Sequence, residues 1–443
     1  MALVLSAGLL GLGFCILILL SFGANDAGRR SLAHGPVLGH VTDRSARVWA
    51  RTRSPGTVVC EALDAAGEVV STATASTGRE HDCTATLVLE GLSPETSYPY
   101  RIRVDGTVFA DPAWTLRTWP APGTPVRLRI GITSCFDDRE FPEARGYAAL
   151  ASLEPDFVLA LGDNAYIDST KVAAHRLRYR SLRSVAPLAA LACHVPTLAV
   201  WDDHNFGKND SGGWLPGKGA FLSCFRDYWP NPPCPLGEGE GCCFAARVGD
   251  VGIWMLDGRW HRTAPGESGA TMLGERQRAW LTESLASSAA RVKLVAIGVP
   301  WCGRMKKPDS WAAYIEERDA LFAEWARCRI PGIVLLSGDT HYCSAWRIDA
   351  PGMYPLHEIN SSGIGREPRD LPRERDGLLR VAENRAECFW FLEIDTASPE
   401  PGIVGTVYGP DGQIACEPLS IPLSSLGFDA VGSPYRSPGW LGE

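Results

Sequence analysis

The stretch FVLALGDNAY, residues 157–166, decides the fold. The run 157–161 is entirely apolar, which is typical of a strand buried on both faces in a parallel sheet between helix layers. Gly162 allows a sharp turn, so Asp163 falls just beyond the strand end, where open α/β sheets bind their ligands. The stretch therefore predicts a strand of an α/β domain that delivers a carboxylate to a crevice.

Three other strand-like runs end in side chains of the metal-ligand type. They are ITSC at 132–135, LAVWDDHNFGKND at 198–210 and VLLSGDTHY at 334–342. Parallel strands present their carboxyl ends at the same edge of a sheet, so we expect these side chains to lie together. The candidates collected in this way are Asp163, Asp202, Asp203, His204, Asp339 and His341, with Cys135 and Tyr166 beside them.

Such a set suits the hydrolysis of phosphate esters. The reaction needs an activated water and neutralisation of developing negative charge, and two metal ions supply both. Asp163 is the best candidate to bridge the metals, and a Tyr166 phenolate would suit trivalent iron. Asp339 and His341, two residues apart at a turn, can point to different metals, while His204 can contact the phosphate or protonate the leaving group.

Each motif also has a purely structural interpretation. A single Gly-Asp after a strand is usually a turn that caps the next helix, and a lone Cys135 is more often a buried thiol than a ligand. For Asp257 and Arg259 in LDGRW we favour an internal ion pair over a phosphate contact. Four histidines are left as structural or solvated: His175, His194, His261 and His357.

Length and composition limit the architecture. The 443 residues exceed the roughly 250–300 at which a single core stops growing, which favours two domains. Residues 31–122 read as an all-β sandwich, with short alternating segments between Pro, Gly and Asp turns. Strands then alternate with helices, and we expect an α/β domain over 126–425 and a carboxyl-terminal tail over 426–443. The net charge of −8 argues against nucleic acid as a partner.

The amino terminus indicates export. Residues 1–30 contain an apolar run suited to a signal peptide or a membrane anchor, with 3–22 as the tether in the second case. We therefore expect an extracytoplasmic protein, whether secreted, periplasmic or membrane-anchored. Cysteine pairs such as Cys60 with Cys83, or Cys234 with Cys242 or Cys243, could then form disulfides.

The strings SC, GDNAY, WDDHNFGKND, LDGRW, GDTHY and INSSG occur in this order. Together they resemble the alkaline phosphatase D family, the PhoD-like branch of the calcineurin-type metallophosphoesterases. The resemblance implies a four-layer α/β/β/α sandwich preceded by an all-β fibronectin III/Ig-like domain. It also implies two metal ions, Fe(III) plus Ca(II), with other divalent metals as alternatives.

The resemblance carries over to individual residues. It places Cys135, Asp163, Tyr166 and His341 around the iron, with Asp163 also bridging to the second metal. That second metal would be held by Asp203 and Asp339, with Asp202 and Asn209 as weaker candidates, and His204 would face the phosphate. One departure is Asn205, which stands where family members often have an acid.

We therefore expect a metal-dependent phosphoester hydrolase of small-molecule or polymeric phosphate esters, acting through a metal-bound hydroxide with His204 and Asp163 as catalytic residues. Two alternatives remain at this stage. One is a surface binding module with a metal-stabilised but inactive phosphoesterase fold, and the other is a phospholipid-directed diesterase tethered to a membrane.

Overall fold

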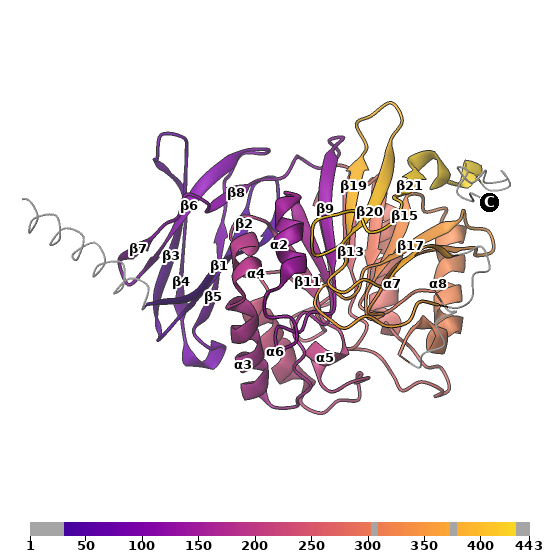
Figure 1. The fold of residues 1–443 in the computed structure, drawn as a ribbon, viewed down its shortest axis with the longest axis horizontal. Helices are drawn as coiled ribbons and strands as arrows, with labels where there is room; N and C mark the ends of the chain where they lie inside the picture. Colours follow the sequence, from indigo (N-terminus) through magenta and orange to yellow (C-terminus); the bar gives the residue numbers. More distant parts are fainter. Residues whose placement is uncertain (1–30, 303–308, 373–378, 431–443) are drawn as a thin grey trace, which may run out of the picture.

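The computed structural model describes residues 31–302, 309–372 and 379–430 (Figure 1). The predicted signal or anchor at 1–30 and most of the predicted tail at 426–443 lie outside these residues. Within the described ranges, no helix combines the length and the apolar character needed to cross a bilayer.

The first part of the chain consists of antiparallel strands in two sheets. One sheet has the order β1-β2-β5, and the other has the order β4-β3-β6-β7, with β8 also pairing with β6. Along β6 (Ser97–Val104) buried and more exposed positions alternate, as they do where one face of a strand packs on a core. The remaining bounds are β1 (Leu32–Val41), β2 (Ala46–Thr52), β3 (Gly56–Leu63), β4 (Val69–Thr77), β5 (Thr84–Leu89), β7 (Thr107–Phe109) and β8 (Thr115–Arg117).

A six-stranded mixed sheet follows, with the order β11-β10-β9-β19-β20-β21. Its central strands β9 (Arg127–Thr133) and β10 (Phe157–Leu161) are parallel to each other, and β11 (Thr197–Val200) extends the parallel half. The antiparallel half comprises β19 (Phe389–Asp395), β20 (Gly402–Tyr408) and β21 (Leu419–Pro422). Every residue of β10 is buried, as its apolar run predicts.

A seven-stranded sheet has the order β12-β13-β14-β15-β17-β16-β18. Its centre is parallel, from β13 (Val251–Met255) through β14 (Val292–Ala296) and β15 (Ile333–Ser337) to β17 (Leu356–Asn360). The antiparallel edges are β12 (Phe244–Val248), β16 (Cys343–Ile348) and β18 (Leu379–Glu383). The chain is thus an α/β protein with several sheets.

The helices lie in two groups (Figure 1). The first group is on the side that faces the amino-terminal strands: α2 (Arg145–Ser152), α3 (Val172–Arg183), α4 (Ala186–Ala192) and α6 (Lys218–Tyr228). The second group is α7 (Gly274–Ser287) and α8 (Ile315–Arg327), which pack on each other at the far side of the seven-stranded sheet. The single-turn helix α5 (Asp203–Phe206) follows β11 directly.

Buried aromatic and arginine side chains join the amino-terminal strands to the α/β part. Trp49 in β2 donates from its indole nitrogen to the Asp227 carbonyl at 2.7 Å and packs against the Tyr228 ring. Tyr100 donates to the Cys193 carbonyl. Arg183 at the end of α3 lies over the rings of Trp49 and Trp229. These contacts bury large apolar area, which favours a fixed arrangement of the two parts.

The cysteines of the described residues are free thiols, but one of the predicted disulfide choices is close to bonding geometry. The sulfurs of Cys234 and Cys243 lie 3.5 Å apart. Both residues flank the Pro- and Gly-rich loop before β12, and Cys234 is only partly buried. A small rotation of either side chain would bring the two sulfurs to bonding distance.

We predict that oxidised glutathione closes the Cys234–Cys243 bond. The loop between these residues is short, so closing it should raise the free energy of unfolding by about 2–3 kcal/mol. Mass spectrometry of alkylated peptides would identify the bond, and urea unfolding would measure the gain. Cys243→Ser should abolish both effects, whereas Cys242→Ser should leave them in place. A bond from Cys234 to Cys242 would contradict the prediction.

Candidate active site

Four strand ends from both sheets supply the predicted ligands. Cys135 lies just beyond β9, Asp163 just beyond β10, and Asp203 begins α5 after β11. Asp339 and His341 follow β15 in the other sheet. Residues more than two hundred positions apart in the sequence therefore meet at one edge, as the crevice rule for α/β sheets predicts.

The backbone at these strand ends is unusual. Cys135, Asp163, Asp339 and His341 have φ angles of 56°, 50°, 70° and 59°, in the left-handed region that costs about 1–2 kcal/mol for a residue with a side chain. Such outliers cluster where a fold over-determines the chain for a functional reason. Here each outlier turns a ligand-type side chain inward at a strand end.

Glycines make room for this packing. Gly162 has φ 95°, and a Cβ atom there would lie 2.5 Å from the Cβ of Asp202. A Cβ on Gly298, which follows β14, would lie 2.6 Å from the Asp202 carboxyl carbon. The first glycine is visible in the sequence motif, but the second becomes apparent only once the two sheets are placed together.

The first cluster contains a thiol, a carboxyl, a phenol and an imidazole. The sulfur of Cys135 lies 3.7 Å from Asp163 Oδ2, and the Tyr166 hydroxyl lies 3.1 Å from His341 Nε2. Ser362 donates to the Cys135 sulfur at 3.2 Å. Burial raises the pKa of Cys135 and of Tyr166 well above their usual values, and the charge of Asp163 adds to both increases.

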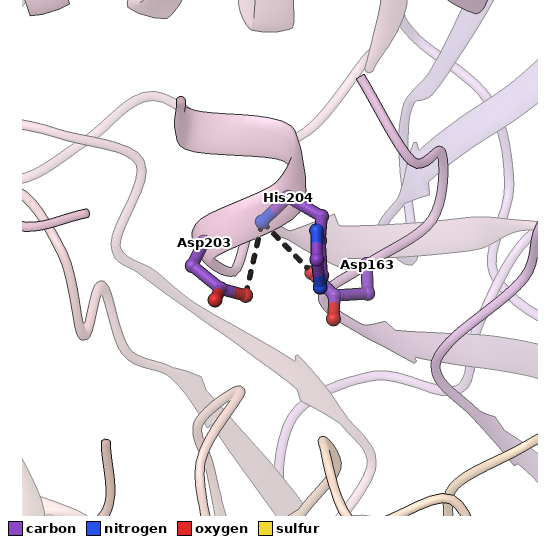
Figure 2. Close-up of side chains that lie close together, drawn as sticks. All are labelled: Asp163, Asp203 and His204. Atoms are coloured by element: carbon purple, nitrogen blue, oxygen red, sulfur yellow. Dashed lines mark hydrogen bonds between the residues drawn. The ribbon is translucent and has the colours of Figure 1, made fainter. Parts of the chain in front are cut away.

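The second cluster is acidic. One ligand atom from each of Asp163, Asp203 and His204 lies within 4.8 Å of the others, a spacing that could hold a metal ion. Figure 2 shows the His204 backbone nitrogen donating to Asp163 Oδ1 at 3.2 Å and to Asp203 Oδ1 at 2.9 Å. Burial raises the pKa of Asp163, and the neighbouring charges of Asp203, Asp202 and Asp339 raise it further. A cation between these groups would favour the charged carboxylates and so oppose the rise in the pKa of Asp163.

Asp202 and Asn209 are placed differently from these ligands. Asp202 accepts a hydrogen bond from Arg259 Nε at 2.6 Å, while its Oδ2 is buried without a hydrogen-bond partner among the described residues. Burial raises the pKa of Asp202 to about 7. Asn209 is exposed, and the backbone of its neighbour Asp210 donates to Asp203 Oδ2 at 2.7 Å. As metal ligands, Asp202 and Asn209 remain predictions.

The expected ion pair between Asp257 and Arg259 is wrong. The Asp257 carboxylate accepts backbone N–H groups instead, from Arg259 and Trp260 at Oδ1 and from Cys242 at Oδ2. Because turn carboxylates often bond to the backbone just after them, the LDGRW spacing itself favours this arrangement. The Arg259 guanidinium extends to Asp202 and to Asp309, with two bonds of 2.7 Å to the latter.

Asp168 and Asn205 complete the surroundings of His204. Asp168 Oδ1 lies 2.6 Å from His204 Nδ1. Asn205 accepts from the Asn164 backbone N–H at 3.0 Å and donates to the Ala165 carbonyl at 3.1 Å. Asn205 therefore ties α5 to the loop after β10, a task that needs both a donor and an acceptor and that an acid could not perform.

Sequence reasoning missed several residues of the site. Asp168 belongs to no sequence motif, and only its place in the same loop as Asp163 could have indicated it. Asp309 lies in the long connection between β14 and α8, which carries no motif. The four histidines set aside earlier do not belong to the clusters described above. His175, for example, stacks on Phe221 and bonds to the Ser169 carbonyl.

Comparison with known proteins agrees with the geometry. A family model described as PhoD-like phosphatase matches residues 130–370, and a domain of unknown function, DUF7800, matches residues 29–126. Alkaline phosphatase D of Bacillus subtilis (strain 168) is 25% identical over 330 residues, 62% of this chain. The match spans 55% of that relative, so the chain covers about half of its length.

Two solved structures share the fold. The structure of PhoD aligns with a TM-score of 0.73 and 19% identity, covering 88% of this chain and 92% of that chain. Purple acid phosphatase PPD1 from yellow lupin (Lupinus luteus) seeds aligns with a TM-score of 0.65 and 13% identity, covering 87% and 74%. The fold is therefore the one shared by these two structures. By its match to the family model, the chain belongs to the PhoD-like phosphatase family.

We predict that Arg259→Gln destabilises the protein by about 3–5 kcal/mol, because it leaves buried Asp202 and Asp309 carboxylates without their cation. Urea unfolding would measure the change. The control is Arg127→Gln, whose side chain is 76% exposed in its pair with Asp395 and should cost at most about 1 kcal/mol. Equal effects from the two variants would show that the Arg259 network contributes no more than a surface pair.

Proposed function

We propose that the protein is a metal-dependent phosphoester hydrolase. The observation that carries this proposal is the convergence of Cys135, Asp163, Tyr166, Asp203 and His341 at the edge where both sheets end. Among the charged groups that act on Asp163, three are carboxylates and His204 is the cation. Membership of the PhoD-like phosphatase family supports the choice of phosphate esters as substrates.

The donor atoms fit two different metal ions. A thiol, a phenol and an imidazole next to Asp163 form a set that suits iron, whereas a set of carboxylate oxygens suits calcium. Cys135, Tyr166 and His341 would hold the first ion and Asp203 and Asp339 the second, with Asp163 available to either. When bound, the ions supply an activated water and neutralise developing charge.

The chain's own residues would place and protonate the substrate. Burial lowers the pKa of His204, but the charges of Asp163, Asp168 and Asp203 outweigh this and raise it to about 10. The Asp168 carboxylate also orients the imidazole ring through its contact with Nδ1 at 2.6 Å. Because Nδ1 of His204 faces Asp168, Nε2 is the nitrogen left to donate to a phosphate oxygen or to the leaving alcohol.

We also propose an architecture for the domains around this site. We infer that the two large sheets and their helices form a four-layer α/β/β/α sandwich over 126–425, preceded by a fibronectin III/Ig-like domain over 31–122. We further propose an extracytoplasmic enzyme that acts on small or polymeric phosphate esters. Support for the first comes from the strand orders and the helix groups, and support for the second comes from the apolar amino-terminal sequence.

We predict that Asp163→Asn lowers hydrolysis of p-nitrophenyl phosphate and bis-p-nitrophenyl phosphate by at least about a thousandfold, because it removes the charge shared by both ions. Elemental analysis should show about two metals per wild-type chain and fewer in the variant. Asp250→Asn is the control, since Asp250 is also buried but bonds to Thr396 away from the clusters. An Asp163→Asn variant with wild-type rates would refute the proposed function.

We also predict that Asp168→Asn lowers kcat about 10- to 100-fold, because His204 loses the carboxylate that orients its ring. If His204 protonates the leaving group, phenyl phosphate should suffer more than p-nitrophenyl phosphate, whose leaving group needs no proton. Asp168→Glu should recover part of the rate. Equal losses on the two esters would limit His204 to phosphate binding, and no loss would remove Asp168 from the mechanism.

A further inference from the structure

Arg366 lies next to the candidate site, but the proposed reaction gives it no role. The loop that carries it is tied to the ligand loops through its backbone. Gly365 donates to the Cys135 carbonyl at 3.2 Å, Asp137 donates to the Gly365 carbonyl at 2.9 Å, and Arg369 donates to the His341 carbonyl at 3.1 Å. The position of Arg366 is therefore fixed relative to Cys135 and His341.

The guanidinium of Arg366 forms the outer wall of the first cluster. Its central carbon lies 4.2 Å from the centre of the Tyr166 ring. Tyr166 is only 1% exposed, whereas the Arg366 side chain is 24% exposed. A cation over a tyrosine ring is attracted to the ring face, so Arg366 remains at the rim with one side toward solvent.

The His204 ring contacts the same tyrosine. Its centre also lies 4.2 Å from the centre of the Tyr166 ring, with a tilt of 38°. His204 and Arg366 therefore both contact the ring of Tyr166. A phosphoryl group held beside His204 would thus lie within one side chain of Arg366.

Arg366 keeps donors available for a ligand. Its Nη1 is shared between Asp137 Oδ2 at 3.4 Å and Glu140 Oε1 at 2.5 Å. The other two nitrogens, Nε and Nη2, make no hydrogen bond with a described residue. Such a pair of parallel donors matches the two oxygens of a carboxylate or phosphate.

The neighbouring acids do not make this rim negative. Asp137 is also paired with Arg139 and Arg178, and Asp138 is paired with Arg178. Three arginines therefore balance Asp137, Asp138 and Glu140. Arg369, three residues beyond Arg366, is exposed and forms no ion pair with a described residue, so it adds positive charge to the rim.

We propose that Arg366 binds a second anionic group on the substrate, so that the preferred phosphate esters carry a carboxylate or another phosphate on their alcohol part. This inference rests on the proposed function, because it assumes that the reacting phosphoryl group lies beside His204. It assigns Arg366 to substrate specificity, since the guanidinium contacts the part of the substrate that leaves.

The test compares two esters that differ in a single charge, phenyl phosphate and 4-carboxyphenyl phosphate, with released phosphate as the readout. Wild-type protein should show the higher kcat/KM on the carboxylated ester. In Arg366→Gln that kcat/KM should fall about tenfold, the effect of losing one charge-assisted contact. The value for phenyl phosphate should change by less than about threefold, as expected where only screened surface charge is altered.

Two variants and a binding measurement complete the design. Arg139→Gln removes another guanidinium bound to Asp137 but far more exposed, and it should preserve the preference. Arg366→Lys should retain part of it. Calorimetry with benzylphosphonate and 4-carboxybenzylphosphonate, which are not hydrolysed, should show the same loss of discrimination in Arg366→Gln.

The possible outcomes distinguish a failure of the proposed role of Arg366 from a failure of the hydrolase proposal. Wild-type protein that hydrolyses both esters equally well, or an Arg366→Gln variant that loses equally on both, would overturn the role of Arg366 while leaving the hydrolase proposal intact. Wild-type protein, loaded with metal, that hydrolyses neither ester would overturn the hydrolase proposal and this inference with it.

Discussion

Repulsion among buried carboxylates is the constraint on which the site depends. Asp163, Asp202 and Asp203 are nearly inaccessible to solvent, and besides burial the charge of Asp203 raises the pKa of both Asp163 and Asp202. A folded chain accommodates such a group by protonating it or by supplying cations. On the side of Asp202 the protein supplies its own cation, Arg259. On the side of Asp163 and Asp203, the spacing of the side chains could hold a metal ion.

Arg259 shows how sharply the two sides are divided. Its guanidinium is completely buried and bonds to Asp202 on one edge and to Asp309 on another. The nearest approach between Arg259 and Asp203 is 3.8 Å, longer than either of those hydrogen bonds. The arginine thus neutralises Asp202 and Asp309 without a hydrogen bond to Asp203, whose oxygens accept from the backbone of His204 and Asp210. Without the guanidinium of Arg259, the Asp202 carboxylate would lack a cation and would compete with Asp163 and Asp203 for a proposed metal ion.

The sequence was sufficient for the strands and for the side chains that terminate them. Apolar runs such as 157–161 and 333–337 are strands in the structure. The spacing over 274–288 and 314–328 predicts helices, and these are α7 and α8. The spacing over 171–191 is also helical, and the structure forms two helices there, because Pro187 lies in the first turn of α4 and restarts the helix. Helix α6 was missed because its segment lies among Gly- and Pro-rich turns that indicate a loop.

The partners of the site residues could not be read from the sequence for a different reason. Arg366 joins Tyr166 only after the two sheets have been packed against each other. Asp309 reaches Arg259 from the connection after β14, the strand next to β13. No local spacing records either contact. The end of a strand can be recognised from the local sequence, whereas the loops that contact it come close only in the folded chain.

The same difference matters for folding. The sheets can form from apolar runs alone, whereas the left-handed turns and the acidic cluster oppose assembly. Under the proposed function, cations would relieve this opposition, which would couple metal binding to the last stage of folding.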